Sequence, residues 1–425
     1  MLNRMDLVRY SEERSRFYQN QLNFWPDLYG EEYALYDVHL FEQDEIKHLR
    51  LATKRIGHLF YKMANLIRHV PDETLLEMGY PEETLTFLRL KTIQMESAIA
   101  RLDLVYTGDS IKCLEINADT PTFIKELFQI GPRLCDHFHL VSPDRWMERR
   151  LQDTINQAIR QSAQSIGKRK PYIVFTSHQD HIEDYYTSLY LQQLADFPSQ
   201  FVPLHKLKII KGEGLFDEEG RKIDILYRQT FPIENLILDQ DIEGNNIGVW
   251  LLELVQTGKL AVINPPSAFL LQNKAVQAVI WNLHVEGHSF FTDEEHEWIE
   301  AYFLPSYLEP DQLATAGKKF VKKPVFGREG NTVEIYGSNG TKIMEDAGKD
   351  YTNYPSLYQE YVELPVREFQ SLKGRQQGHY IIGSFLLNGR AGALGIRIGN
   401  PITDNLSYFL PVGMGNIDVP FNKVN

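Results

Sequence analysis

The sequence predicts a mixed α/β and α+β protein that begins with a helical segment, on three observations. Apolar residues recur at helical spacing in the first hundred residues, most clearly between Asp44 and Arg68. Strand and helix patterns then alternate through the middle of the chain, which indicates an open α/β layer. After Pro305 the pattern changes to short strands separated by turns, which is typical of an antiparallel α+β region. We expect three parts: residues 1–95, 96–270 and 271–425.

The composition favours a globular protein and excludes several partner classes. The chain has 425 residues, of which 43% are hydrophobic, so it can bury a sizeable core. A formal net charge of −13 argues against nucleic acid or an anionic membrane as the main partner. Cys113 and Cys135 are too few for a disulfide framework or a cysteine-based zinc site. The chain shows neither a signal-peptide pattern nor an apolar run of transmembrane length, so we expect a cytoplasmic protein.

In the first part, the spacing predicts a long helix over residues 44–68 and a second helix over residues 81–98. Before them, the stretch FWPDLYGEEYALYD (residues 24–37) is rich in aromatic residues. This stretch could pack into the core or act as a lid, and we favour the core.

The middle of the chain reads as an alternation of strands and helices whose polar residues follow the strands. In open α/β sheets, functional groups gather at the carboxyl ends of the strands. We expect helices over residues 145–167, 184–194 and 268–284, and strands over residues 171–178, 201–210 and 222–230. Further along, we expect a strand, a glycine loop and a strand over residues 318–337, then strands within residues 358–365, 379–389 and 391–399.

The stretch CLEINADTPT (residues 113–122) carries a row of oxygen-bearing side chains on a predicted strand. Glu115, Asn117 and Asp119 alternate with Leu114, Ile116 and Ala118, so the two sets should face opposite sides. The strand follows RLDLVY (residues 101–106) and a turn cluster, which predicts a hairpin.

The register of this hairpin decides whether it can hold a metal ion. With a three-residue loop, Asp103 lies opposite Glu115 and Arg101 lies opposite Asn117. Two facing carboxylates favour a bound cation, and hard oxygen ligands suit Mg²⁺. A two-residue loop would instead place Asp103 opposite Leu114. The alternative is a solvated sheet face with an Arg101 salt bridge, and both interpretations stay open on spacing alone.

Three further motifs have a functional and a structural interpretation. Gly327 and Gly330, which follow Lys322 and Lys323, could cover a phosphate or form an ordinary hairpin turn. The acids of HQDHIEDYY (residues 178–186) could hold an ammonium group, although first-turn helix acids are the favoured interpretation. In GIRIGNPITDNLSYF (residues 395–409), Arg397 suggests contact with an anion, whereas Asp404 and Asn405 are typical turn residues.

Taken together, these motifs resemble the synthetase domain of glutathionylspermidine synthetases and trypanothione synthetases, which has the ATP-grasp fold. The resemblance covers most of the chain from about residue 95 onward, and no single motif is specific. It is carried by RLD (101–103), LEINADTPT (114–122), KKPVFGREGN (322–331), YQEYVELP (358–365), GSFLLNGRAGALGIR (383–397) and ITDNLS (402–407). It implies an ATP-grasp region over residues 271–425, preceded by a pre-ATP-grasp α/β domain and the N-terminal helical segment.

The resemblance implies an ATP-dependent carboxylate–amine ligase that uses ATP and Mg²⁺. In that family the carboxylate accepts the γ-phosphoryl group of ATP to form an acyl phosphate, and an amine then displaces phosphate and leaves an amide. The implied partners are a small carboxylate, such as a glutathione-like peptide, and an amine such as a polyamine.

Carried over motif by motif, the resemblance assigns the site residues to four groups. The implied metal ligands are Asp103, Glu115 and Asn117. The implied phosphoryl-stabilising residues are Arg101, Arg328 and Arg397. The implied substrate contacts are Thr120, Glu183 and Asp184, while Asp119 is expected to cap the following turn. The implied ATP contacts are Lys274 on the helix expected over 268–284, Lys323, Gly327, Gly330, Gln359, Glu360, Tyr361, Val362, Ile402, Thr403 and Asp404.

The chain also departs from the bifunctional members of that family. It has no counterpart of their amidase domain, and neither Cys113 nor Cys135 has the sequence context of a nucleophile, so we expect no amidase activity. The acid and the amine are not fixed by the motifs, and a homodimer is left open. Two alternatives are a non-catalytic ATP-binding regulatory module and a ligase that acts on a peptide or another macromolecular amine.

Overall fold

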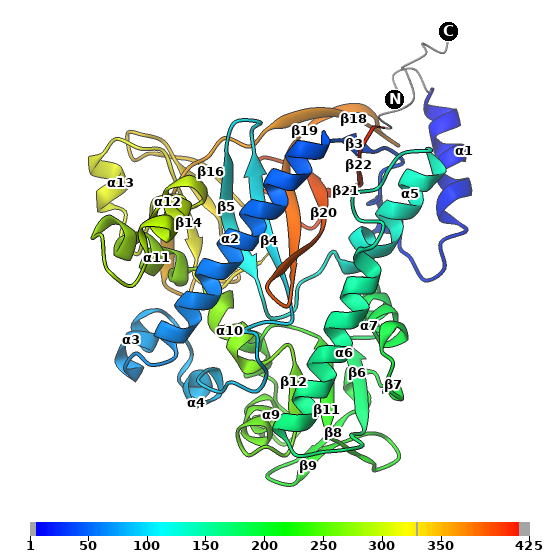
Figure 1. The fold of residues 1–425 in the computed structure, drawn as a ribbon, viewed down its shortest axis with the longest axis vertical. Coiled ribbons are helices and arrows are strands. Elements are labelled where there is room, and N and C mark those ends of the chain that lie inside the picture. Colours follow the sequence, from blue (N-terminus) through cyan, green and yellow to red (C-terminus); the bar gives the residue numbers. More distant parts are fainter. Residues whose placement is uncertain (1–5, 329, 416–425) are drawn as a thin grey trace.

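The computed structural model describes residues 6–328 and 330–415. Its central element is an antiparallel sheet in the order β21-β20-β19-β4-β5, and β18 also pairs with β19 (Figure 1). The sheet joins strands from both sides of the boundary predicted at residue 270. Its strands are β4 Ile99–Tyr106, β5 Ile111–Asn117, β18 Val366–Ser371, β19 Gly374–Leu387, β20 Arg390–Gly399 and β21 Tyr408–Leu410.

Helix α2 (Gln43–Ile67) lies across one face of this sheet (Figure 1), which confirms the long helix expected over residues 44–68. Its side chains at helical spacing are buried in the same core cluster as the sheet residues Leu102 and Leu394. A capping box between Glu42 and Glu45 satisfies backbone N–H groups at its first turn.

The expectation of a second helix over residues 81–98 is wrong for most of its length. Only a 3-10 turn (Glu82–Thr84) and the short helix α4 (Leu85–Leu88) form there. Beyond them, the buried carboxylate of Glu96 pairs with Arg68 and with Lys91, which draws this segment into a tertiary contact. The ion pair between Arg68 and Glu96, 28 residues apart, is a tertiary contact that the helical spacing does not show.

The second sheet is the parallel layer that the strand–helix alternation predicts. Its order is β12-β11-β6-β7, and α6 and α7 pack on it in the lower half of Figure 1. Its elements are α6 Met147–Ser165, β6 Ile173–Ser177, α7 Ile182–Leu194, β7 Ser199–Phe201, β11 Ile225–Gln229, α8 Ile233–Leu236, α9 Ile247–Gln256 and β12 Ala261–Ile263.

Two strands expected in this layer are each divided. The stretch 201–210 splits into β7 and β8 (Lys208–Ile210) around a 3-10 turn, Leu204–Lys206, that follows Pro203. The stretch 222–230 splits into β10 (Lys222–Ile223) and β11, because the Asp224 side chain accepts the backbone N–H of Tyr172 at 2.9 Å. Strands β8, β9 (Gly214–Phe216) and β10 form a small sheet of their own.

The third sheet has the order β13-β17-β14-β15-β16 and contains the predicted glycine-loop hairpin. Its elements, with the helices near it, are α10 Pro266–Gln272, α11 Ala275–Val285, α12 Asp293–Tyr302, β13 Ser306–Tyr307, α13 Asp311–Thr315, β14 Phe320–Pro324, β15 Glu334–Tyr336, β16 Lys342–Glu345 and β17 Ser356–Glu360.

The helix expected over residues 268–284 is interrupted at Asn273, between α10 and α11. Asn273 takes an extended conformation, and its side chain accepts the N–H of Ala275 at 2.8 Å and donates to the Met78 carbonyl at 2.8 Å. Local bonding of an asparagine side chain to the backbone competes with the helix. The interruption leaves Lys274 at the junction of the two helices rather than inside one.

The N-terminal aromatic stretch packs as core, as we favoured. Trp25 is 1% exposed, and Tyr33 and Tyr36 are also buried, whereas Tyr29 at a hairpin turn is 63% exposed. The remaining elements are α1 Leu7–Tyr18, β1 Asp27–Leu28, β2 Glu31–Glu32, β3 His39–Leu40, α3 Asp72–Glu77, a π-helical turn Glu126–Ile130, α5 Gly131–His137 and β22 Val412–Gly413.

None of the helices in the described ranges combines the length with the apolar composition that crossing a lipid bilayer requires.

Candidate functional site

The site is built on the hairpin of β4 and β5, whose strand pairing is the one that could bring the two carboxylates together. Asp103 pairs with Glu115 and Arg101 pairs with Asn117. The predicted three-residue loop is wrong, because Thr107 and Ser110 bond across a two-residue tip. The expected pairing is recovered because the register shifts between Asp103 and Leu104.

This shift is a β-bulge at Leu114, which has no partner in the ladder. Ile111 and Cys113 face the core before the bulge, and Ile116 and Ala118 face it afterwards. Leu114 therefore lines the cleft next to Glu115, which corrects the expectation that it shares a face with Ile116. Its unpaired carbonyl accepts Lys323 Nζ at 3.0 Å and Gln277 Nε2 at 3.1 Å.

One cleft gathers most of the residues that the motifs indicated. Asp184 and Asp404 do not line it. Among the predicted residues, it is lined by Arg101, Asp103, Glu115, Asn117, Thr120, Glu183, Lys274, Lys323, Gly327, Arg328, Gly330, Gln359, Glu360, Tyr361, Val362, Arg397, Ile402 and Thr403.

The two carboxylates at the base of the cleft lie among cationic side chains. Arg101 donates to both oxygens of Asp103, at 2.7 and 3.0 Å, and Lys274 Nζ lies 3.3 Å from Glu115 Oε2. Burial raises the pKa of Glu115, but the charges of Lys274, Lys323 and Arg101 outweigh it and hold that pKa at about 2. Glu115 is therefore ionised at neutral pH.

The donor set of Asp103, Glu115 and Asn117 fits Mg²⁺. Among the described residues no group of three or more His, Cys, Asp or Glu side chains could hold a metal ion. Two carboxylates and an amide oxygen on a rigid hairpin nevertheless match an ion that completes its shell with water and phosphate oxygens. The Asn117 amide lies 3.2 Å from Glu115 Oε1, so these side chains are already in contact.

Two lysines reach this carboxylate pair from different elements. Lys323, from β14, is buried and bonds to Gln359 Oε1 at 2.8 Å as well as to Leu114. Burial lowers the pKa of Lys323 to about 8, although Glu115 opposes that shift. Lys274 comes from the junction of α10 and α11 and donates to the Gly327 carbonyl at 2.7 Å.

The loop between β14 and β15, which we call the flap (described residues 325–328 and 330–333), lines one side of the cleft. Arg328 Nη2 donates to Thr120 Oγ1 at 2.6 Å and to the Thr120 carbonyl at 3.3 Å. Gly330 has φ of +72°, and a Cβ there would lie 2.7 Å from both Ile402 and Thr403. Glycine is needed at residue 330 for two reasons, the positive φ and the close approach to Ile402 and Thr403.

Part of the cleft is apolar, and apart from Leu114 and Val362 its apolar residues were not named by the sequence analysis. Val105, Leu364 and Ile381 form a buried cluster to which Leu114 and Val362 add. Val321, Val333 and Ile335 also line the cleft. Apolar side chains beside residues 359–362 suit an aromatic base. The only sequence signal was the alternation of apolar residues along these strands.

At the opposite end, Arg397 and Glu183 face the cleft beside aromatic side chains. Arg397 Nη2 donates to the Asp404 carbonyl at 2.7 Å, so Asp404 positions this arginine while its carboxylate accepts the N–H of Leu406. Asp184 pairs with His181 at 3.1 Å instead of reaching the cleft. Leu28, Tyr29, Tyr33 and Phe123 also line this end. Only the aromatic richness of residues 24–37 pointed toward the first three.

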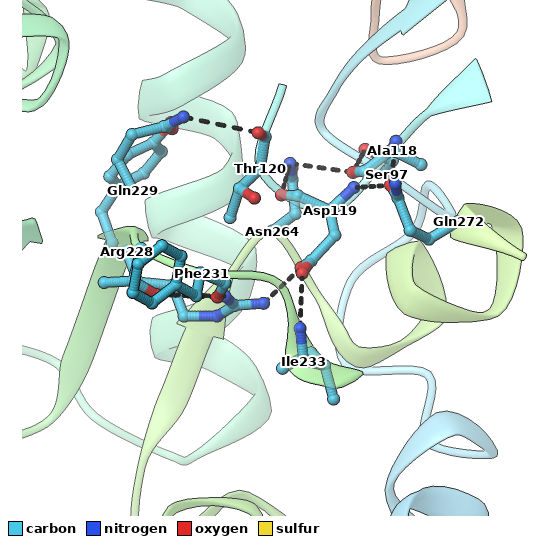
Figure 2. A network of polar contacts seen from close by, with 12 residues as sticks. Ser97, Ala118, Asp119, Thr120, Arg228, Gln229, Phe231, Ile233, Asn264 and Gln272 are labelled. Atoms are coloured by element: carbon cyan, nitrogen blue, oxygen red, sulfur yellow. Dashed lines mark hydrogen bonds and ion pairs between the residues drawn. The ribbon is translucent and has the colours of Figure 1, made fainter. Parts of the chain in front are cut away.

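A buried polar network fastens the turn after β5, as Figure 2 shows. Asp119 pairs with Arg228 and accepts the N–H of Ile233 at 3.3 Å, so it holds the start of α8 and does not cap its own turn as expected. Asn264 donates to the Ala118 and Asp119 carbonyls at 3.1 and 2.8 Å, and Gln272 accepts both of their N–H groups. Thr120 is thereby held rigidly beneath the flap.

Comparison with known proteins identifies the fold class and the family. A glutathione synthetase-like effector from Globodera pallida, solved in apo form, superposes with a TM-score of 0.59 at 12% identity, over 97% of this chain and 98% of that one. With the three sheets and the flap, this defines an ATP-grasp-related fold of the glutathione synthetase kind. The family described as glutathionylspermidine synthase preATP-grasp matches residues 8–414, and the chain belongs to it. A Haemophilus influenzae protein named "Putative acid--amine ligase" is 28% identical over 332 residues, 73% of each chain.

Proposed function

We propose that the protein is an ATP-dependent ligase that joins a small carboxylic acid to an amine through an amide bond. The observation that carries this proposal is the meeting of Asp103 and Glu115 with two lysines and three arginines beneath a glycine flap. Membership of the family, and the printed name of the Haemophilus relative, support the same reaction class.

The cleft offers what phosphoryl transfer asks of a protein, which is positioning and neutralisation of charge. Lys274 and Lys323 would hold the phosphates of ATP, and the apolar part of the cleft beside residues 359–362 would hold the base. Asp103, Glu115 and Asn117 would hold Mg²⁺, which supplies positive charge to the phosphate oxygens. Ile402 and Thr403 would complete the nucleotide pocket under Gly330.

The chemistry follows from an acid bound beside the γ-phosphate. A carboxylate oxygen attacks the γ-phosphorus and ADP leaves, which gives an acyl phosphate. The amine nitrogen then attacks the acyl carbon, phosphate leaves, and the nitrogen loses a proton. Arg101, Arg328 and Arg397 would stabilise the charge on the transferring group. Thr120 and Glu183 lie where they would contact the acid or the amine, and a glutathione-like acid and a polyamine-like amine fit the family.

An amidase activity is not part of this proposal. Cys113 and Cys135 are the two cysteines of the chain and both are buried. Burial raises the pKa of Cys135 to about 12 and raises that of Cys113 further, so neither thiol is poised as a thiolate nucleophile.

The test is nucleotide turnover against a panel of acids and amines with Mg-ATP, with mass spectrometry of the products. We expect ADP, phosphate and an amide that form only when one acid and one amine are both present. Absence of acid- and amine-dependent ADP release across a broad panel would contradict the proposal.

A further inference from the structure

Glu234 is a buried carboxylate that the proposed reaction does not use. It lies on the short helix α8, directly after β11, and is 1% exposed. Neither of its carboxylate oxygens accepts a hydrogen bond from another described residue, although its own backbone N–H acts on the carboxylate. A buried carboxylate without a partner is costly, so its presence calls for an explanation.

The titratable groups whose charges influence Glu234, or are influenced by it, come from four separate segments. They are Arg328 in the flap, Asp119 in the turn after β5, Lys274 at the junction of α10 and α11, and Tyr354 in the segment before β17. Burial raises the pKa of Glu234 to about 7, and the charge of Arg328 is the strongest influence that opposes this rise. At neutral pH the carboxyl group is therefore about half protonated.

Arg328 has a buried hydrogen-bond donor without a partner among the described residues. This donor is its Nε, whereas its Nη2 donates to Thr120, which follows Asp119 in the chain. Asp119 bonds to Ile233, the residue before Glu234, so the two unsatisfied groups lie in the same buried region. A carboxylate and a guanidinium N–H are the two halves of a charge-assisted hydrogen bond, which has not formed here.

The network of Figure 2 anchors the segment that carries Glu234 and the threonine to which Arg328 bonds. Asp119 accepts the N–H of Ile233, the residue that precedes Glu234. Thr120, the residue that follows Asp119, accepts a hydrogen bond from Arg328. Because one buried ion pair between Asp119 and Arg228 holds this region, α8 and Thr120 keep a fixed separation beneath the flap. The flap is then the segment whose movement would form the bond.

We propose that Glu234 is a positioning residue whose carboxylate accepts the Nε–H of Arg328 when the flap closes over Mg-ATP, and so fixes the plane of the guanidinium beside the transferring phosphoryl group. This rests on the proposed function, because it takes the cleft to be a nucleotide site. Formation of the bond ionises Glu234, and its proton leaves to the solvent. Nucleotide binding near neutral pH therefore releases this proton.

The test is calorimetric titration of the full chain with Mg-ATP at pH 7 in two buffers that differ in ionisation enthalpy. The proteins are the wild type, Glu234→Gln, Arg328→Gln, the double variant, and Glu243→Gln as a control at an exposed turn. Compared with Glu234→Gln, the wild type should release roughly half a proton more per nucleotide, since the group is half protonated at its pKa.

Affinities from the same titrations form a double-mutant cycle. Each single variant should bind Mg-ATP about tenfold more weakly, and the double variant should bind no more weakly than the weaker single. Fully additive losses, or wild-type proton release and affinity in Glu234→Gln, would overturn the inference and leave the proposed function intact. Failure of the wild type to bind Mg-ATP would overturn both, and ligase turnover in the acid–amine panel tests the proposed function separately.

Thermal stability separates positioning from a structural role. The folded pKa of Glu234 lies above its unfolded value, so this group costs stability as pH rises from about 4.5 through 7. Glu234→Gln should therefore melt at a higher temperature than the wild type at pH 8, with a smaller gain at pH 5. A lower melting temperature at pH 8 would assign Glu234 to the structure and overturn the inference.

Discussion

At the scale of single residues, two carboxylates from the stretch CLEINADTPT have different roles in the structure. Glu115 lines the cleft and is held ionised by cations that remain open to a ligand. Asp119, four residues later, is buried against Arg228 and fastens α8. In this stretch of alternating polar residues, Glu115 is therefore suited to binding a ligand, whereas Asp119 stabilises the structure around it.

Glu115→Ala should abolish turnover without unfolding the protein. The substitution removes a proposed Mg²⁺ ligand and leaves Lys274 and Lys323 without their carboxylate, so we expect turnover to fall by about a hundredfold or more. Steady-state turnover and circular dichroism check this. Asp109→Ala, at the exposed tip of the same hairpin, should keep wild-type turnover. Near-normal turnover in Glu115→Ala would remove the metal assignment.

Binding of Mg-ATP should weaken as pH rises above about 8. The pKa of Lys323 is lowered to about 8 by burial, so the side chain loses the charge that attracts phosphate above this pH. The Kd should rise by up to about tenfold per pH unit there. Lys323→Gln should bind weakly with a flatter profile, and Lys322→Gln, whose lysine pairs with Glu334, should keep the wild-type profile. A flat wild-type profile up to pH 10 would refute this role.

At the scale of elements, irregularities bring the two lysines to the carboxylates. The bulge at Leu114 frees a carbonyl that holds Lys323. The interruption at Asn273 places Lys274 between α10 and α11, where its backbone N–H bonds to Val325 and its side chain reaches Glu115. Regular strands and an unbroken helix would not produce these contacts.

These irregularities separate the features that could be predicted from the sequence from those that could not. The alternation of Glu115 and Asn117 predicts the hairpin and its face, because side-chain direction in a strand is local. The bulge depends on Lys323 and Gln277, which lie 209 and 163 residues away, and no local pattern shows such partners. The helix predicted over residues 81–98 is wrong for a similar reason, since Glu96 pairs with Arg68, 28 residues away, as well as with the nearby Lys91.

The flap should tolerate no side chain at Gly330. In Gly330→Ala the new Cβ would lie 2.7 Å from Ile402 and Thr403, so the flap must shift and Mg-ATP affinity should fall about tenfold or more. Gly340→Ala is the matched control, because its φ of +75° carries a similar strain and a Cβ there meets open space. Binding titrations compare them, and equal losses in both variants would show that strain alone is responsible.

At the scale of the whole molecule, the central sheet unites the chain. β4 pairs with β19 from Ile99–Leu387 to Leu104–Ile382, so the β4–β5 hairpin is held by strands from beyond the predicted boundary at residue 270. The cleft likewise takes residues from the N-terminal aromatic stretch, the hairpin and the flap. The site therefore exists only when all three parts of the chain are folded together.

A fragment that ends at residue 270 should not fold independently. It lacks β19 and β20, so β4 would present an unpaired edge and α2 would lose the sheet that covers its apolar face. Thermal melting followed by circular dichroism should show no cooperative transition, in contrast to the full chain. A cooperative transition in a soluble monomeric fragment would support the predicted boundary and contradict this expectation.

The most direct test of the proposed ligase reaction follows the carboxylate oxygen atoms of the acid substrate into the products. Once the panel has found an acid and an amine that turn over, the acid is supplied with a heavy oxygen isotope in its carboxylate, and the phosphate is examined by phosphorus NMR. Passage through an acyl phosphate transfers one labelled oxygen to phosphate for each amide formed, with ADP as the nucleotide product. Unlabelled phosphate, or label that appears in AMP, would contradict the proposed reaction.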